Sequence, residues 1–279
     1  MKVKHDMKSI LKHVLIYTAL IMGALIMVFP FYWMITGAFK NQAEISQFPP
    51  LWVPNTWSFA NFKFALETAP FARYFLNSVI VTVCCVVCTS FTTIVGAFAF
   101  SRLKFPGRDI IFSLLLSLMM IPFEMLVITN YRTIISWGMI NTMPALIIPF
   151  TSSIFYTYIL RNFFLSIPDS LYQSARIDGA SNWQYLWKVM VPIAKPSLVT
   201  IILLNAISCW NSFLWPMLVT NTASARTLPF GLYVFITEGG ARNEYMMAAA
   251  TIVVLPMIIL FLLTRKSIVS GVARGGLKG

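Results

Sequence analysis

The chain has 279 residues, of which 58% are hydrophobic and only 11% are charged. Soluble domains usually carry about a quarter charged residues, and a soluble core cannot enclose so much apolar surface. The composition therefore excludes an ordinary soluble protein and indicates one that is dissolved in lipid. The net charge of +12 would also suit nucleic-acid binding. However, the basic residues are scattered over short segments beside apolar runs, so no nucleic-acid partner is expected.

Uncharged runs long enough to cross a bilayer, which takes about 20 residues, recur along the whole chain. A sixth segment, 110–131, qualifies if Glu124 is tolerated near its outer end. We therefore expect an all-α integral membrane protein with six transmembrane helices. The first run is too long for a signal-peptide core and lacks a cleavage site, so it is read as a retained helix. The five uncharged runs are 14–39, 74–101, 133–160, 196–225 and 245–264.

Lysine and arginine set the expected orientation, because they are enriched in the cytoplasmic loops of membrane proteins. With the N-terminus inside, 15 of the 21 basic residues fall in cytoplasmic segments and 6 fall outside. Both termini are therefore predicted to be cytoplasmic. The resulting plan has an N-terminal segment 1–13, a first span 14–39, an outer loop 40–73, a transmembrane domain 74–264 and a tail 265–279.

The outer loop 40–73 combines four prolines with large aromatic residues that include Phe48, Trp52, Trp57, Phe59 and Phe62. The prolines argue against a long helix. The aromatic residues would suit either the membrane interface or a docking surface for an external partner, and both interpretations stay open.

The four cysteines lie inside predicted spans, three of them close together at Cys84, Cys85 and Cys88. No histidine or carboxylate lies near these three in the sequence. Because a buried cysteine behaves as a small hydrophobic residue, we interpret them as packing residues and predict no metal site.

The longest predicted cytoplasmic loop, 163–195, contains several signals of ordered structure. Pro168 and Asp169 are typical of a helix start. Asp178-Gly179 would end that helix, with glycine free to adopt a positive φ. Ser181 and Gln184 have the spacing of a capping box at the start of a second helix. There Trp183, Leu186, Trp187 and Met190 would form one apolar face, which could lie on lipid or in a groove of another protein.

The run from Ile167 to Ser181, closing at Val191-Pro192, resembles the signature loop of the permeases of binding-protein-dependent ABC importers. That signature begins Glu-Ala-Ala, has glycine four residues after the triplet, and closes with a proline. The spacing matches here, as do Asp178, Gly179, Ala180 and Pro192. Gln173 stands where glutamate is usual and Ser174 where alanine is usual, so the charge of the first position is lost.

Further stretches are similar to the MalG-like carbohydrate branch of this family and together cover nearly the whole chain. They are Asn77-Ser78, Ala97 to Gly107, Gly138 with Asn141-Thr142, the Trp210-Asn211-x-Phe213-x-Trp215-Pro216 run, and the C-terminal Gly271-x5-Gly276-x-Lys278-Gly279. The resemblance implies the fold of a type I importer permease in a bacterial inner membrane, and it favours a sugar or oligosaccharide as the transported substrate.

The resemblance also implies partners: a second homologous permease subunit, two ATP-binding cassette ATPase subunits, an extracytoplasmic solute-binding protein and membrane lipid. ATP and Mg would be bound by the ATPases, since this chain has no phosphate-binding loop and needs no cofactor of its own. The tail would reach between the ATPases through Gly275, Gly276, Lys278 and Gly279. The residues implied in ATPase coupling are Gln173, Ser174, Ala175, Asp178, Gly179, Ala180, Trp183 and Trp187.

A sugar path needs aromatic faces together with amide or hydroxyl groups, and Trp210, Asn211 and Ser212 supply these in the fifth span. Their alternative role is packing against the partner permease. Glu124 is a carboxylate in an apolar context, which makes it a candidate for substrate binding or gating. It could equally lie in water at the outer boundary, since Arg132 follows eight residues later.

Two other functional classes are alternatives to a transport subunit driven by separate ATPases. A secondary transporter needs ionisable relays within its spans, and these spans offer almost none. A membrane enzyme needs a catalytic cluster, but the only histidines, His5 and His13, lie near the N-terminus. Within the ABC importers, a non-sugar solute such as a polyol or glycerol phosphate remains the alternative substrate.

Overall fold

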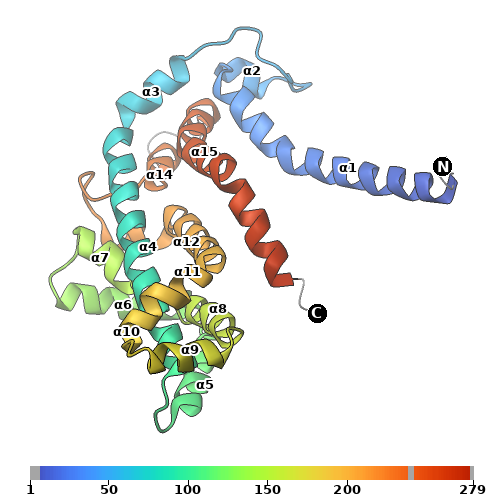
Figure 1. Cartoon of the computed structure of the whole chain (residues 1–279). Coiled ribbons are helices and arrows are strands. Elements are labelled where there is room, and N and C mark those ends of the chain that lie inside the picture. The colour runs from blue at the N-terminus through green and yellow to red at the C-terminus, as the bar shows by residue number, and fades with distance from the viewer. Residues whose placement is uncertain (1–6, 238–241, 277–279) are drawn as a thin grey trace. The chain divides into compact units, whose positions relative to one another are not determined.

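The computed structural model describes residues 7–237 and 242–276, with side chains over 11–236 and 242–262. Every regular element in the described part is helical, which agrees with the all-α prediction (Figure 1). Three helices are long and apolar enough to cross a membrane. They are α1 (Met7–Ala38), α4 (Phe71–Arg102) and α15 (Asn243–Gly276).

Three further candidate spans are pairs of shorter helices that meet at a bend. α5 (Arg108–Leu118) and α6 (Phe123–Ser136) meet at 96°. α7 (Met143–Ile147), continued by η1 (Ile148–Phe150), meets α8 (Ile154–Leu165) at 44°. The segment Asn182–Ile193 meets α12 (Lys195–Trp210) at 81°. If each pair is one span, the described residues hold the six spans that the sequence predicts.

Three of the six predicted runs are not continuous helices, and one of these, 110–131, is bent between α5 and α6. The run 133–160 is broken after Ser136, where Gly138 and Asn141 adopt positive φ angles of 67° and 65° that no α-helix can continue through. The run 196–225 is broken after Trp210, and α13 (Leu214–Val219) follows. Pro216 lies in the first turn of α13, where its missing N–H costs nothing, whereas in a continuous helix it would remove a hydrogen bond.

The chain divides into two compact units, and the first comprises Met1–Ala69 and Leu232–Leu255. In this unit the end of α1 is fixed by Lys40, whose ammonium donates to the carbonyl oxygen of Leu51 and lies 4.3 Å from the ring centre of Trp33. Asn61, in α3 (Ala60–Thr68), donates to the carbonyl oxygens of Ala38 and Lys40. The outer loop is therefore ordered around buried polar contacts.

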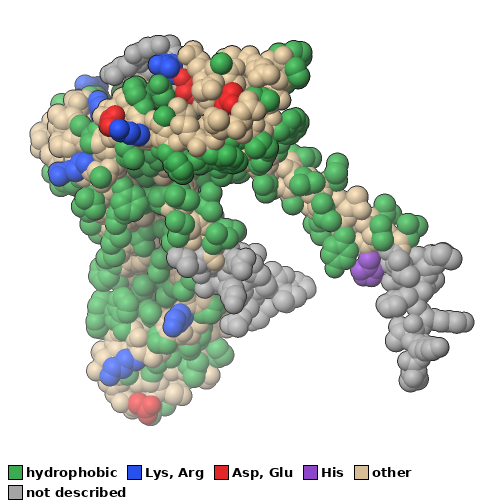
Figure 2. All heavy atoms as spheres, turned by 90° about the horizontal axis from the view of Figure 1, so that it is seen from above, with side chains coloured by type: hydrophobic (Ala, Val, Ile, Leu, Met, Phe, Trp, Pro, Cys, Tyr) green, Lys and Arg blue, Asp and Glu red, His purple; other side chains and the backbone are tan. Residues whose placement is uncertain are grey.

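Much of the apolar surface of this unit is left uncovered by the unit itself. In α1, the most apolar 18-residue window is 0% buried, which leaves that surface for lipid or another subunit. The outer loop also contains α2 (Gln42–Ser46) and presents exposed aromatic rings at Phe48, Trp52, Trp57 and Phe59. Figure 2 shows hydrophobic side chains over most of the visible surface of the described helices.

The second unit, Pro70–Gly231 and Pro256–Gly279, is organised around α4, which packs against α8 and α12. One core cluster joins these three helices through residues such as Phe98, Leu160 and Ile201. A second cluster lies around Trp215, whose indole N–H donates to the carbonyl oxygen of Ala145. The remaining elements of the described chain are α9 (Asp169–Ile177), α10 (Asn182–Tyr185), η2 (Leu186–Met190), α11 (Val191–Ile193) and α14 (Phe230–Thr237).

Side chains from neighbouring elements bind the backbone groups that the helix breaks leave free. Thr89 and Thr92 of α4 donate to the carbonyl oxygens of Phe150 and Thr151, between η1 and α8. The Asn77 amide donates to the carbonyl oxygens of Ser224 and Arg226 at 2.8 and 2.9 Å. The breaks are therefore ordered features, because unsatisfied backbone groups are costly in a membrane.

Asn141 provides a test of this account. Its side-chain oxygen accepts hydrogen bonds of 3.0–3.1 Å from the backbone N–H groups of Asn221 and Thr222 and from the Thr222 hydroxyl. Asn141→Gly keeps the positive φ but removes these bonds, so we expect a loss of about 1–2 kcal/mol in stability. Asn141→Asp retains the acceptor oxygens and should lose less. Thermal unfolding in detergent measures both, and equal melting temperatures for wild type and Asn141→Gly would contradict the assignment.

Candidate functional site

The predicted helix, glycine turn and second helix are present in the loop 163–195. α9 begins after Pro168 with Asp169 in its first turn, and Gly179 follows its end with φ +77°. The Ser181 hydroxyl accepts from the backbone N–H of Gln184, while the Gln184 side chain accepts from the backbone N–H of Ser181, at 3.2 and 2.9 Å. The capping box is therefore confirmed at the start of α10.

The apolar face of the second helix does not lie where we expected it, free for lipid or a partner. Leu186 and Met190 are fully buried in the chain's own core beside Phe98 and Phe164. The segment passes from α-helix in α10 to the π-helical η2, and single π-helical turns within helices are frequent at functional sites. Of the two tryptophans, Trp187 is half-buried against the core, while the Trp183 side chain is 55% exposed.

Arg102, the last residue of α4, fixes the start of this loop. One terminal nitrogen of its guanidinium donates to the carbonyl oxygens of Phe164 and Ile167 at 2.7 and 2.6 Å, and the other donates to the carboxylate of Asp169. The Arg102 side chain is only 4% exposed. A planar fork of N–H donors can satisfy several acceptors at once, so the end of α4 and the start of α9 are held as one piece.

The residues that the resemblance implies in ATPase coupling lie around the glycine turn. Gln173, Ser174, Asp178 and Gly179 are exposed, whereas Ala175 and Ala180 are half-buried. A Cβ atom added to Gly179 would meet no atom of the described residues within 4 Å. Beside the turn lies a surface cavity of about 380 Å³, whose lining residues are Ala175, Asp178, Gly179, Ala180, Gln184, Tyr185, Lys188 and Val189.

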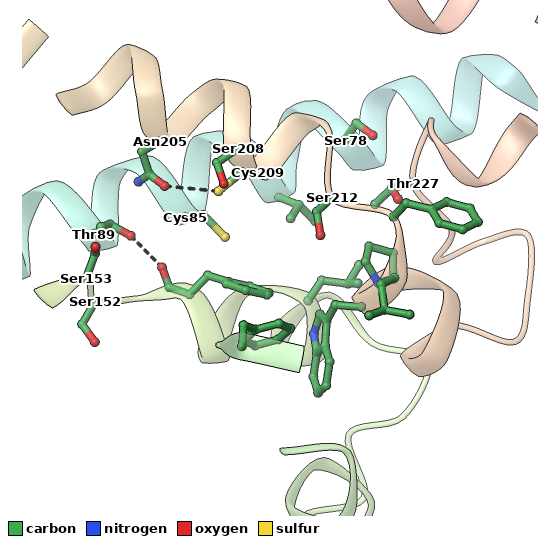
Figure 3. Close-up of a pocket in the computed structure, with 18 of the residues that line it drawn as sticks. Ser78, Cys85, Thr89, Ser152, Ser153, Asn205, Ser208, Cys209, Ser212 and Thr227 are labelled. Atoms are coloured by element: carbon green, nitrogen blue, oxygen red, sulfur yellow. Dashed lines mark hydrogen bonds between the residues drawn. The ribbon is translucent and has the colours of Figure 1, made fainter. Parts of the chain in front are cut away.

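A second cavity, of about 470 Å³, lies among α4, α7, α8, α12 and α13 (Figure 3). Aromatic side chains form part of its wall, including Phe123, Phe150 and Trp215. Small polar side chains form another part: Ser78, Thr89, Ser152, Ser153, Asn205, Ser208, Ser212 and Thr227. Apolar surface with a few placed polar groups is typical of small-molecule sites, so we refer to this cavity as the central pocket.

Of the four residues predicted for the substrate path, Ser212 and Glu124 line the central pocket. Trp210 and Asn211 are not among the lining residues. Trp210 is 8% exposed and its ring lies 5.7 Å from that of Phe75 in α4, so it packs within this chain. Asn211 is the exposed residue that ends α12.

The sequence prediction missed the other polar residues of the pocket, above all Asn205 and Ser208. The signal that could have found them is spacing, because Asn205, Ser208 and Ser212 stand at i, i+3 and i+7 and therefore on one helix face. Figure 3 shows the side chains of Asn205 and Ser208 on the same side of α12.

Cys85 and Cys209 also line the central pocket, and Cys85 belongs to the core cluster around Trp215. All four cysteines are free thiols. Within the described part of the chain, no group of three or more histidine, cysteine or carboxylate side chains is placed to hold a metal ion. Of the predicted tail contacts, Gly275 and Gly276 end α15, while Lys278 and Gly279 lie outside the described residues.

The sequence model of one protein family matches residues 91–274, a region that contains the loop and most of the pocket-lining residues. The chain belongs to the binding-protein-dependent transport system inner membrane components. It is thus a multi-pass subunit of an ABC importer, as the resemblance of its loop predicts.

Proteins similar along almost their whole length include importer subunits for different solutes. The diacetylchitobiose uptake system permease protein DasC of Streptomyces coelicolor is 34% identical, covering 91% of this chain and 92% of DasC. The sn-glycerol-3-phosphate transport system permease protein UgpE of Yersinia pestis is 28% identical, covering 90% and 92%. A crystal structure of a bacterial ABC transporter that imports the acidic polysaccharide alginate superposes with a TM-score of 0.83 at 25% identity, covering 95% and 99%.

The Arg102 contacts predict that replacing this residue makes the loop 163–195 less ordered. Arg102→Ala leaves two buried carbonyl oxygens without their donor and should destabilise the loop by about 3 kcal/mol or more. Arg102→Lys should rescue only part of this, because an ammonium is a single point and cannot span three acceptors. The rate of protease cleavage within 163–195 in membrane vesicles measures the effect. Arg176→Lys, on the exposed side of α9, is the matched control, and equal cleavage rates for all variants would refute the role of Arg102.

Proposed function

We propose that this chain is one of two permease subunits of an ATP-driven importer that takes up a sugar or oligosaccharide across a bacterial inner membrane. The proposal rests on the geometry of the loop 163–195 in a chain that belongs to this transport family. The loop has the helix, turn and capping geometry expected of a coupling element, and its matched residues Asp178 and Gly179 are exposed.

Coupling to the ATPase subunits would take place at the glycine turn. The residues that would contact an ATPase are Gln173, Ser174, Asp178, Gly179 and Trp183, all exposed, with Ala175, Ala180 and Trp187 half-buried behind them. Because Arg102 ties the start of α9 to α4, a displacement of the loop would be passed to a core helix of the second unit. Such rigid-body transmission is a common way for a remote event to move a membrane domain.

The remaining partners follow from the same proposal. An extracytoplasmic binding protein would deliver the solute, a second permease would complete the path, and ATP with Mg would be bound by the ATPase subunits. The tail, including Gly275 and Gly276, would approach the ATPases, because residues without bulky side chains allow close backbone contact. Both termini would be cytoplasmic, as the distribution of basic residues predicts.

The substrate class rests on two kinds of support. DasC belongs to an uptake system for diacetylchitobiose, and the central pocket offers hydroxyl, amide and aromatic groups suited to a sugar. A polyol or glycerol phosphate is the second candidate, because UgpE is a similar subunit of a glycerol-3-phosphate system. Purified importer in liposomes decides between them, since the loaded binding protein that stimulates ATP hydrolysis identifies the solute. Stimulation only by peptide or metal binding proteins would refute both.

The coupling role predicts that a bulky side chain at position 179 strongly reduces uptake. Gly179→Trp should reduce uptake by more than about tenfold and abolish co-purification of the ATPase while the protein remains in the membrane. The left-handed φ by itself costs a non-glycine residue about 1–2 kcal/mol, so Gly179→Asn, which tolerates this φ, separates strain from bulk.

Gly138 provides a matched control, because it also has a positive φ and an added Cβ there would meet no atom within 4 Å. Gly138→Trp should therefore retain ATPase binding. Normal uptake and normal ATPase co-purification in Gly179→Trp would exclude the coupling role.

The proposed tail contact has its own test. Deleting residues 274–279 should lower uptake or uncouple ATP hydrolysis from transport, because the tail would no longer reach the ATPases. Uptake and ATP hydrolysis are measured on the same liposomes. Unchanged values of both would remove the tail from the interface.

A further inference from the structure

The central pocket contains two buried polar groups that the chain itself does not satisfy. The side-chain nitrogen of Asn205 and the hydroxyl of Thr227 are buried without a hydrogen-bond partner among the described residues. The two residues are 5% and 4% exposed, and both line the pocket. An unsatisfied buried polar group costs about 1–3 kcal/mol, so a ligand in the pocket that pairs with these two groups would remove that cost.

The Asn205 amide is held in a defined direction. Its oxygen accepts from the Cys209 thiol at 3.4 Å, one turn further along α12, which leaves the amide nitrogen as the free donor. The labelled hydroxyl of Ser208 follows one turn along α12, and that of Ser212 lies just beyond the end of this helix (Figure 3). These groups form a line of neutral donors and acceptors.

The aromatic wall of the pocket is equally well fixed. Trp215 is 1% exposed, and its ring centre lies 5.9 Å from that of Phe123 and 6.4 Å from that of Phe150. The hydrogen bond from its indole N–H to Ala145 prevents the ring from turning. A preformed apolar wall opposite neutral polar groups suits a ligand with one apolar face and several hydroxyl groups.

The charge in the pocket distinguishes between the substrate classes. Of the described residues that line it, Glu124 alone has a charged side chain. None of the ion pairs within the described chain includes Glu124, so its carboxylate is not neutralised there. Arg226 is next to the pocket-lining Thr227 in sequence, but its guanidinium lies over the Phe230 ring at 4.0 Å and is not part of the lining. The wall therefore repels anions and offers them no cation.

We propose that the central pocket is a subsite for one uncharged sugar ring, with Asn205 donating to a ring hydroxyl and Glu124 excluding uronates and phosphate esters. This proposal rests on the proposed function and deepens it by selecting among its substrates. It sets this chain apart from the alginate and glycerol-3-phosphate systems to which it is similar, because their solutes are anions. One hydrogen bond to a sugar hydroxyl raises the affinity of the pocket about tenfold, and one repulsive charge lowers its affinity for an anion by a similar factor.

The cysteines of the chain allow a direct test. Cys209 is half-buried and lines the pocket, whereas Cys88 is equally half-buried on α4 and does not line it. The full importer, purified through a tag on this chain, is prepared with either Cys209 or Cys88 as the only cysteine of this subunit. Modification by a methanethiosulfonate reagent is then timed with a neutral panel (glucose, galactose, arabinose and N-acetylglucosamine) and an anionic panel (glucuronate, galacturonate and glycerol 3-phosphate).

We expect at least one neutral sugar to slow the modification of Cys209 and none to affect Cys88, with no protection by the anions. Asn205→Leu keeps a side chain of similar size but removes the donor, so the protecting sugar should be needed at about five- to tenfold higher concentration. Glu124→Gln should allow glucuronate or galacturonate to protect Cys209. Glu67→Gln, on the exposed face of α3 and outside the pocket, is the control and should not.

Three results would overturn the proposal: equal protection by neutral and anionic sugars, no protection by any sugar, or no effect of Glu124→Gln on the anions. Stimulation of ATP hydrolysis by a sugar-loaded binding protein is recorded on the same preparation. If that stimulation is present while no sugar protects Cys209, the pocket proposal fails and the proposed function stands. If peptide or metal binding proteins alone stimulate the ATPase, the proposed function fails.

Discussion

The structure depends on how a membrane protein satisfies the backbone groups that its broken helices release. No water is available in the hydrocarbon region, so each free carbonyl oxygen needs a donor from elsewhere in the chain. Here the donors are single side chains at fixed places, such as Thr89 for Phe150, Trp215 for Ala145 and Asn77 for Ser224. The second unit can bend its spans sharply for this reason, and its central pocket lies among these bends.

The same principle connects the two functional regions. At the other end of α4, Arg102 provides donors for carbonyl oxygens released at the end of α8, just as the threonines do further along the helix. One helix thus contributes both to the wall of the pocket and to the anchoring of the loop that would meet the ATPases. The proposed coupling loop and the central pocket are therefore linked through α4 by contacts between named atoms.

The sequence predicted the fold class, the number of spans and the glycine turn, because these follow from hydropathy, charge and local backbone chemistry. It failed where tertiary contacts override a local pattern. The apolar run 133–160 appeared to be one span, but the Asn141 oxygen stabilises a break by binding residues 80 positions away. Leu186 and Met190 appeared to be a docking face because periodicity does not reveal which neighbour covers it. Asn205 was not predicted as a pocket residue, because a single polar residue in an apolar run does not show which groups it contacts in the fold.

The open space around Gly179 has a consequence for the genetics of the system. Among the described residues, no atom lies near enough to oppose a side chain at that position, so a defect caused by bulk there would arise at the proposed contact with the ATPase. Second-site suppressors of such a substitution should therefore map to the gene of the ATPase subunit. Suppressors of changes at Arg102, by contrast, should arise within this chain, since all the acceptors of its guanidinium belong to the same polypeptide. Under the proposed coupling role, Gly179 would be constrained by a partner protein, whereas Arg102 is constrained by contacts within its own chain.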